Sequence, residues 1–497
     1  MESAPRLRVR TIATDRSGFS ATFRPPRHRP RDSMAPTRRT RRMRLLLINP
    51  VNPLALARVR QSQWNRYRIW KPLGLLTVAA LTPADYEIAV IDENLGMPAY
   101  GEMPRPDIVG ITAFTSQATR AYEAARHFRD RGVPVVMGGI HASMCPQEAL
   151  QHVDCVAIGE AEGIWPHVLA DARRGRLAKS YTADHAETAA IPRARHDLLP
   201  RGYAFGAVQT TRGCPLNCSF CSVTSFNGAR YRGRPIADVI DEMRTIREKL
   251  ILVVDDNLIG TSAAHIARAK ELFRAMIAAG LRKKWIAQVT INMGDDEELL
   301  ALAAAAGCAG VFIGFESPTP EGLAEVGKKF NLIKGRDARA SVQRIQRHGI
   351  LVAGSFIIGL DSDGRGIGRR IADAGSRYGV DILNTLFLTP LPGTRLWDKM
   401  HGEGRISANA FPSDWRYYTL TFPVAHYKQL SQSQVIREME SCDRRFYSRW
   451  RTLRRVWSSL WRRRHPLVSL VGNLSYRSSL LRNRQTYRDF AGRAARS

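Results

Sequence analysis

The stretch GAVQTTRGCPLNCSFC, residues 206–221, determines which fold we expect for this chain. It joins a short run of β-forming residues to three cysteines, Cys214, Cys218 and Cys221, within one loop. Thiolates at this density are typical ligands of iron–sulfur clusters or of zinc. A closed structural zinc site needs four ligands, and the sequence places no fourth Cys or His in or beside the loop. Three thiolates on a four-iron cluster would instead leave one iron open to a substrate.

Strand-like runs and helical segments alternate after this loop. A helix is expected from Pro235, where apolar residues recur with the helical period, and later helices should end at glycines such as Gly280 and Gly307. With residues 206–211 as the first strand, six β/α units predict a partial (β/α)6 barrel, whose chemistry belongs at the carboxyl ends of its strands. The later strands are ILVV from Ile251, WIAQVTI from Trp285, VFIGF from Val311, LVAGSFIIGL from Leu351 and ILNTLFLT from Ile382.

The cysteine spacing, with Phe220 directly before the last cysteine, resembles the signature of the radical S-adenosylmethionine (radical SAM) superfamily. Segments 212–235, 253–260, 306–317, 354–361 and 388–394 also resemble that family's barrel. The resemblance implies a four-iron four-sulfur cluster on the three cysteines and cleavage of SAM to a 5′-deoxyadenosyl radical. It also implies an external electron donor of the flavodoxin or ferredoxin type.

The same resemblance suggests which side chains contact SAM. Asp255, Asp256 and Asn257 end the second strand, where the family commonly contacts the methionine amine, although the common Gly-Gly-Glu form is absent. Glu316 ends the fourth strand and is the candidate for the ribose hydroxyls. Carboxylates at strand ends also serve to tie loops together, so a structural role is the alternative for each.

An earlier alternation of strands and helices precedes the barrel. Five β-rich runs, at residues 45–49, 87–92, 108–112, 135–139 and 156–159, predict a doubly wound, Rossmann-like parallel sheet. Ligands of such sheets lie beyond the carboxyl ends of the strands. Small or polar residues stand there, and they form our candidate cofactor rim: Thr112, Thr115, Ser116, Gly138, Gly139, His141, Gly159 and Glu160.

A doubly wound domain ahead of a radical SAM barrel resembles the cobalamin-binding subclass of the superfamily. Residues 138–143 (GGIHAS) and 158–162 (IGEAE) occupy the positions that usually surround the nucleotide tail of cobalamin. One departure is the absence of the Asp-x-His-x-x-Gly motif after the first strand, where NPVNPLALARVR stands. The resemblance therefore implies cobalamin whose cobalt takes no histidine from that loop.

The reaction that this resemblance favours is methylation of an unactivated carbon in a small-molecule or lipid-like substrate. One SAM would methylate cobalamin, and a second would yield the radical that removes hydrogen from the substrate. Three alternatives stay open: oxidative cyclisation of a tetrapyrrole, modification of tRNA, and a non-enzymatic nucleic-acid-binding protein with a structural metal. Against tRNA modification, the N-terminal domain has no second cysteine trio for an auxiliary cluster.

The net charge of +30 is concentrated at the two ends of the chain, which argues against nucleic acid as the main partner. Near the C-terminus, Trp450, Val456, Trp457, Leu460 and Trp461 are interleaved with arginines. Such a basic helix indicates either peripheral contact with a membrane or a helix that packs on its own domain with a solvated arginine face.

The four scattered cysteines and the absence of a long apolar run favour a cytoplasmic protein, peripheral at the membrane if the basic helix binds lipid. We expect five regions. They are a disordered Arg-rich extension (1–43), a cobalamin-binding domain (44–182), a linker (183–203), a partial barrel (204–420) and a basic helical region (421–497).

Overall fold

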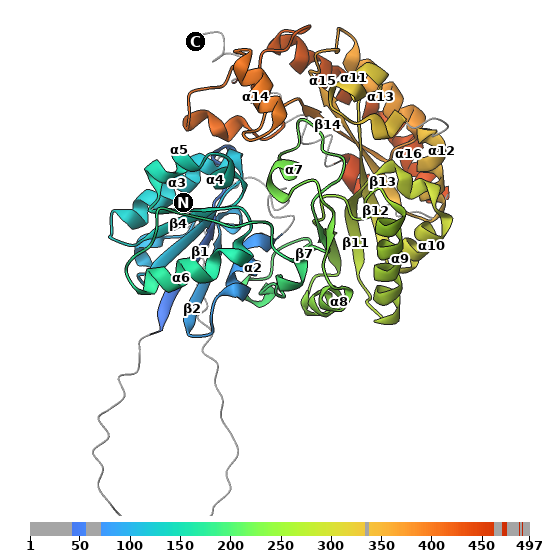
Figure 1. Cartoon of the computed structure of the whole chain (residues 1–497). Helices are drawn as coiled ribbons and strands as arrows, with labels where there is room; N and C mark the ends of the chain where they lie inside the picture. The colour runs from blue at the N-terminus through green and yellow to red at the C-terminus, as the bar shows by residue number, and fades with distance from the viewer. Residues whose placement is uncertain are drawn as a thin grey trace, which may run out of the picture.

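The computed structural model describes residues 42–55, 71–332, 337–461 and 470–474, together with Tyr487 and Phe490. The predicted disordered extension lies outside the described residues except for its last two positions, as does most of the chain after Trp461. Within the described part, two parallel sheets with helices on their faces stand beside each other (Figure 1). The predicted α/β fold class is therefore confirmed.

The N-terminal sheet has six parallel strands in the order β2-β1-β3-β4-β5-β6, one more than predicted. The additional strand at the edge has three residues, none of them buried, so no hydrophobic alternation announces it. The strands are β1 (Met43–Asn49), β2 (Tyr86–Asp92), β3 (Ile108–Thr112), β4 (Val135–Gly138), β5 (Cys155–Ile158) and β6 (Ser180–Thr182).

Helices cover both faces of this sheet, as a doubly wound fold requires. On β1, Leu45 and Leu47 pack in the same cluster as Trp165, whereas Leu46 and Ile48 face the other way, into the cluster that contains Phe128. Strands buried on both faces read as continuous apolar runs, which is why LLLIN was recognisable in the sequence. The helices are α2 (Leu73–Leu81), α3 (Ala118–Arg129), α4 (Ile140–Met144), α5 (Pro146–His152) and α6 (Trp165–Arg173).

The second sheet also has six parallel strands, and each lies beside the one before it in the chain. Such an order arises when one β/α unit after another adds to the same edge, and it confirms the partial barrel. The strands are β7 (Gly206–Val208), β10 (Leu250–Val253), β11 (Lys284–Val289), β12 (Cys308–Glu316), β13 (Leu351–Ile358) and β14 (Ile382–Phe387).

The helices between these strands end where the glycines predicted. Gly280 and Gly307 have φ angles of 62° and 97°, the left-handed conformation that glycine adopts most readily. The helices of this half are α7 (Ser222–Asn227), α8 (Ile236–Thr245), α9 (Ala263–Ala278), α10 (Glu297–Ala305), α11 (Pro320–Glu325), α12 (Ala338–Arg347), α13 (Ile367–Tyr378), α14 (Arg395–Gly402), α15 (Gln432–Phe446) and α16 (Arg449–Trp461).

The segment between the two sheets is packed rather than extended. Ala194, Leu199 and Tyr203 form a small buried cluster with Leu76 of α2, and the Tyr203 hydroxyl donates to Asp92 at 2.6 Å. This packing fixes where the second sheet begins relative to the first. No helix in the described part of the chain is both long and apolar enough to cross a membrane.

Candidate functional site

The three cysteines lie on the loop between β8 (Thr211–Arg212) and α7, at the start of the second sheet. Backbone bonds shape this loop: the Cys214 N–H donates to Gly228 O at 3.2 Å, and the Cys221 N–H donates to Cys218 O at 3.3 Å. Gly213 is left-handed (φ 83°), and a Cβ there would strike the Arg230 carbonyl. The loop conformation therefore depends on glycine directly before the first cysteine.

Burial raises the pKa of all three thiols, that of Cys218 to about 12, so the free thiols are protonated at neutral pH. Among the described residues, no three His, Cys, Asp or Glu side chains are close enough to form a ready-made metal site. The thiols would have to turn toward one another and lose their protons when metal binds. Three soft sulfur donors on one short loop nevertheless fit an iron–sulfur cluster.

Glu316 forms a buried ion pair with Lys328 beside the cysteine loop. Lys328 Nζ lies 2.6 Å from Glu316 Oε1, and both side chains are less than a tenth exposed. Burial opposes the charge of Lys328, but Glu316 and the thiols of Cys218 and Cys214 together raise the pKa of Lys328 above its usual value. A permanent positive charge is therefore buried next to the thiols.

The backbone at Glu316 departs from regular strand geometry. Its φ angle is 63°, and the register between β12 and β13 shifts between Gly314 and Glu316. A Cβ at Gly314 would collide with both Glu316 Oε1 and Lys328 Nζ. A non-glycine residue in this conformation is held there by its surroundings, and such residues are frequent in functional sites.

The three polar residues after β10 have different surroundings. Asp255 accepts hydrogen bonds from Thr210 N, Thr210 Oγ1 and Thr211 Oγ1. These bonds engage both of its oxygens and tie the end of β10 to the start of β8. Asp256 accepts through one oxygen, Oδ2, from Gly213 N at 2.7 Å and from Asn227 at 3.0 Å. Burial raises the pKa of Asp256 to about 6.

Asn257 is buried and exchanges hydrogen bonds with Thr290 at 3.3 and 3.4 Å. All three residues therefore lie where the sequence placed them, at the end of β10. Asp256 also bonds the amide directly before the first cysteine.

In the N-terminal sheet, the predicted rim residues gather at the ends of β3, β4 and β5. The Ser143 hydroxyl donates to Gly139 O at 3.0 Å and accepts from Gly159 N at 2.9 Å. Gly139 has a φ angle of 87° and approaches Thr112 closely, so a side chain would not fit. Thr115 and Ser116 lie on the short helical turn after β3, and Gly138 ends β4.

His141 of α4 is fully buried, and its two ring nitrogens differ. Nε2 lies 2.8 Å from the Tyr122 hydroxyl and 3.4 Å from Glu148, whereas Nδ1 is buried with no hydrogen-bond partner among the described residues. A buried polar atom without a partner costs free energy. Nδ1 is thus the one polar atom of the His141 ring whose hydrogen-bonding capacity the described residues leave unused.

Glu160 joins the two halves of the molecule. It accepts from Arg212 at 2.9 Å and from Arg232, and these two arginines lie on β8 and on β9 (Arg232–Gly233), next to the cysteine loop. Glu162 adds a second pair with Arg212 at 2.7 Å. Burial opposes ionisation, but Arg232 and Arg212 lower the pKa of Glu160 below its usual value. Both of its oxygens are engaged by protein groups.

The two sequence-predicted sites are neighbours in space. α4 of the rim contacts α7, which begins directly after Cys221, and Arg212 lies two residues before Cys214. A segment after α14 also reaches over the N-terminal half (Figure 1), where Trp415 Nε1 donates to Glu148 at 2.9 Å and Thr119 donates to Pro412 O at 2.9 Å. The rim and the cysteine loop therefore belong to one region between the two sheets.

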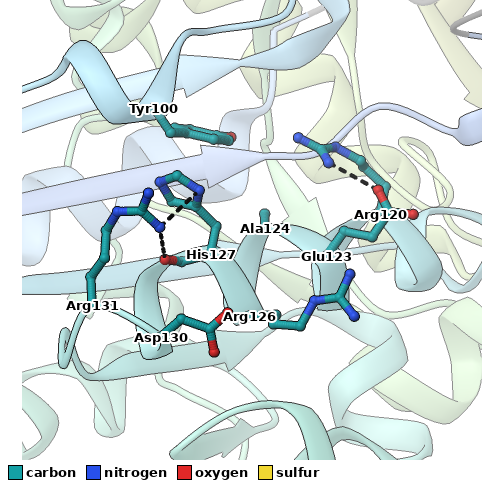
Figure 2. Close-up of a pocket in the computed structure, with 8 residues that line it drawn as sticks. All are labelled: Tyr100, Arg120, Glu123, Ala124, Arg126, His127, Asp130 and Arg131. Carbon is teal, nitrogen blue, oxygen red and sulfur yellow. Dashed lines mark hydrogen bonds and ion pairs between the residues drawn. The ribbon is translucent and has the colours of Figure 1, made fainter.

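A cavity of about 380 Å³ lies elsewhere, on the outer face of α3 (Figure 2). It is lined by Tyr100, Arg120, Glu123, Ala124, Arg126, His127, Asp130 and Arg131, none of which is a predicted site residue. Arg120 is paired with Glu93 at 2.7 Å and with Glu123 at 2.9 Å, and Arg131 bonds the His127 carbonyl. Arg120 and Arg131 are thus already engaged by protein groups.

Sequence reasoning missed four residues of this region: Arg212, Arg232, Lys328 and Trp415. Arg212 carried a local signal, because it stands beside the cysteine motif. The other three act through partners 12 to 267 positions away in the chain, and no local pattern announces such pairs.

Comparison with known proteins gives two family matches. Residues 208–365 match the radical SAM superfamily, and residues 65–169 match the B12 binding domain. The chain is 27% identical to the bacteriochlorophyllide d C-12(1)-methyltransferase of Chlorobaculum tepidum, over 76% of this chain and 82% of that protein. It is 26% identical to the hopanoid C-2 methylase of Rhodopseudomonas palustris, over 76% of this chain and 71% of that one.

A solved structure shares the fold. It is the radical S-adenosylmethionine methyltransferase TsrM from Kitasatospora setae with cobalamin and a [4Fe-4S] cluster bound, with a TM-score of 0.57 and 20% identity. The alignment covers 74% of this chain and 79% of that one. The chain is a radical SAM enzyme whose cofactors are a four-iron four-sulfur cluster, SAM and cobalamin, and it belongs to the B12-binding, cobalamin-dependent subclass of the superfamily.

Proposed function

We propose that this enzyme transfers a methyl group to an unactivated carbon of a small-molecule or lipid-like substrate. The observation that carries the proposal is the contact of α4, at the predicted cobalamin rim, with α7, directly after the third cysteine. A methyl carrier and a radical source bound at these two places would face a common space. Relatives named for the methylation of a bacteriochlorophyllide and of a hopanoid support this reaction class and an apolar substrate.

In this proposal Cys214, Cys218 and Cys221 hold the cluster through three of its irons. When bound, the cluster and SAM supply the radical, and cobalamin supplies the methyl group. Lys328 offsets part of the negative charge of three thiolates, since it is a buried cation beside them. Glu316 is held by Lys328 through Oε1, which leaves Oε2 as the oxygen for the ribose hydroxyls of SAM.

The surroundings rank the remaining candidates. Both oxygens of Asp255 are engaged by Thr210 and Thr211, so we assign it to bracing the strand ends. Asp256, which uses only Oδ2 in hydrogen bonds to the protein, is the better candidate for the methionine part of SAM. Asn257 ranks behind it, because Thr290 engages both of its amide atoms. For cobalamin we propose Thr115, Ser116, Gly138, Gly139, His141 and Gly159, with Glu160 as a positioning residue that joins this rim to the cysteine loop.

The test is anaerobic reconstitution of the full chain with iron, sulfide and cobalamin, followed by turnover with a flavodoxin-type reductant and SAM carrying a deuterated methyl group. Lipid and tetrapyrrole extracts serve as substrate pools, and mass spectrometry detects the label. Labelled product supports the proposal. Products that lose hydrogen without gaining the label would favour oxidative cyclisation instead.

A further inference from the structure

The helix α16 turns three large apolar residues outward. Trp450, Leu453 and Trp457 are 77%, 63% and 70% exposed, and their spacing of three and four residues places them on one face of the helix. The opposite face carries Thr452 and Ser459, which are at most 9% exposed. This arrangement is the reverse of an ordinary surface helix, whose apolar stripe faces the core.

Arginines take the inward positions that apolar residues would normally fill. Arg451 pairs with Asp373 of α13 at 3.2 Å. The Arg455 guanidinium lies 3.9 Å from the centre of the Phe446 ring and donates to the Phe446 carbonyl at 2.9 Å. The helix therefore packs on its own domain, as one of the two alternatives had it, but through these arginines rather than through Trp450 and Trp457.

A second exposed apolar segment lies beside the helix. Leu470, Val471 and Leu474 are 36%, 56% and 50% exposed, and Arg455 donates to Asn473 within that segment at 2.8 Å. We call Trp450, Leu453 and Trp457 of α16 the apolar face. α13 and α15, on which α16 packs, belong to the side of the molecule away from the N-terminal sheet (Figure 1).

The charge around the apolar face is positive. Arg449 and Arg454 are exposed on α16, and residues 449–461 contain no Asp or Glu. A second copy of this chain would bring the same basic surface against itself in a symmetric dimer, which like-charge repulsion opposes. A partner that combines negative charge with an apolar layer complements this face. The headgroup region of an anionic bilayer, with acyl chains directly beneath it, is such a partner.

We propose that the apolar face docks the enzyme on the surface of membranes that contain anionic lipids. The indole rings would lie at the level of the headgroups, where tryptophan is enriched in membrane proteins, and the exposed arginines would contact lipid phosphates. The proposal stands on the packing of α16 alone and does not depend on the substrate or the reaction.

The test is flotation of the full chain with vesicles of phosphatidylcholine alone or mixed with phosphatidylglycerol, at low and high salt. We expect binding to the anionic vesicles that fades as salt rises, because screening weakens attraction to exposed arginines. The double variant Trp450→Ser/Trp457→Ser should bind at least about tenfold more weakly, since it removes the interfacial anchors. SAM cleavage by that variant should be unchanged, which verifies its fold.

The matched control is Met97→Ser/Ile277→Ser, which removes two exposed apolar side chains, 46% and 42% exposed, outside the apolar face. It should bind vesicles as the wild type does. Absence of wild-type binding to anionic vesicles, or equal binding by the tryptophan variant, overturns the proposal. So does sedimentation showing a dimer that the tryptophan variant dissociates, or salt-sensitive tRNA binding in place of vesicle binding.

Discussion

Glu160 and Glu316 occupy similar places in the two halves of the molecule but have different partners. Each follows or ends a parallel strand, each is buried, and each is paired with a cation. The cations of Glu160 come from the other half of the molecule, on both sides of the cysteine loop. The cation of Glu316 comes from its own β/α unit, 12 residues along the chain.

This difference separates two roles that look alike in the sequence. The ion pairs of Glu160 depend on the distance between the N-terminal rim and the cysteine loop, because they join residues on the two sides. The ion pair of Glu316 does not depend on that distance, because both of its partners belong to one β/α unit. Burial and charge alone therefore do not identify a cofactor ligand. Whether the paired cation comes from the same half of the molecule or from the other half distinguishes the two glutamates better.

The largest loss of activity should come from changes in the cysteine loop, which lies beside the cations that pair with both glutamates. Replacing Cys214, Cys218 or Cys221 by Ala should reduce 5′-deoxyadenosine formation to the detection limit, because two thiolates cannot hold the cluster with its open iron in place. Chromatography of reconstituted protein with SAM measures the product. Cys308→Ala is the control: Cys308 is a core thiol of β12 and should leave the iron content unchanged. Wild-type cleavage by any of the three loop variants would contradict the assignment.

Glu316→Gln should cause the next largest change. It leaves the buried Lys328 without its counter-charge, and loss of one partner of a buried pair costs about 3–5 kcal/mol of unfolding free energy. Denaturant unfolding measures the loss.

The double variant Glu316→Gln/Lys328→Met should recover much of that stability, since no unpaired charge remains. Glu87→Gln, at a solvent-accessible pair with Arg44, is the matched control and should change the unfolding free energy by less than about 1 kcal/mol. If the single and double variants were equally unstable, the ion pair would not be the cause.

The parts of the fold and the site that could be predicted are those whose residues form a pattern within a short stretch of sequence. LLLIN and the runs at β12 and β13 are buried on both faces, so their apolar letters mark them as strands. β10 and β11 alternate buried residues with more exposed ones, the period of two that also marks a strand. The cysteine loop was visible because its ligands are adjacent in the chain. The Glu160–Arg232 pair spans 72 residues and Trp415–Glu148 spans 267, and only the folded topology brings such residues together. The outward face of α16 was open for the same reason, since the sequence does not say which side of a helix meets the core.

Asp363 is a third buried carboxylate, and unlike Glu160 and Glu316 it is hydrogen-bonded to backbone amides and not to a cation. It accepts from Gly359 N and Leu360 N at 3.0 Å each, and burial raises the pKa of Asp363 to about 6 from an ordinary value of 3.8. The folded state therefore binds this proton more tightly than the unfolded state does. Its contribution to stability is complete below about pH 4 and is lost as the pH rises to about 6.

The gap between the two pKa values of Asp363 corresponds to about 3 kcal/mol. Asp363→Asn keeps an acceptor for both amides and removes the titration. The unfolding free energy of the wild type, measured relative to that of the variant at each pH, should thus fall by about 3 kcal/mol between pH 4 and pH 7. A constant difference across that range would show that Asp363 titrates normally.

The smallest effect, and the most direct test of the role given to Glu160, should come from its neighbour Glu162. Glu162→Gln keeps the shape of the side chain but removes the charge that pairs with Arg212 at 2.7 Å, while Glu160 still holds Arg212. Glu162 accepts two hydrogen bonds from Arg212, and a Gln amide can accept only one of them. We therefore expect a loss of about 1–2 kcal/mol of unfolding free energy, as for one charge-assisted hydrogen bond. Cluster and cobalamin content should be unchanged.

The magnetic interaction between cob(II)alamin and the reduced cluster, seen by electron paramagnetic resonance, should weaken or broaden, because it depends on the distance between the two halves. Glu123→Gln on α3, whose side chain is 48% exposed, is the matched control and should leave the spectrum unchanged. An unchanged spectrum for Glu162→Gln would mean that these ion pairs stabilise the fold without setting the spacing of the two cofactors.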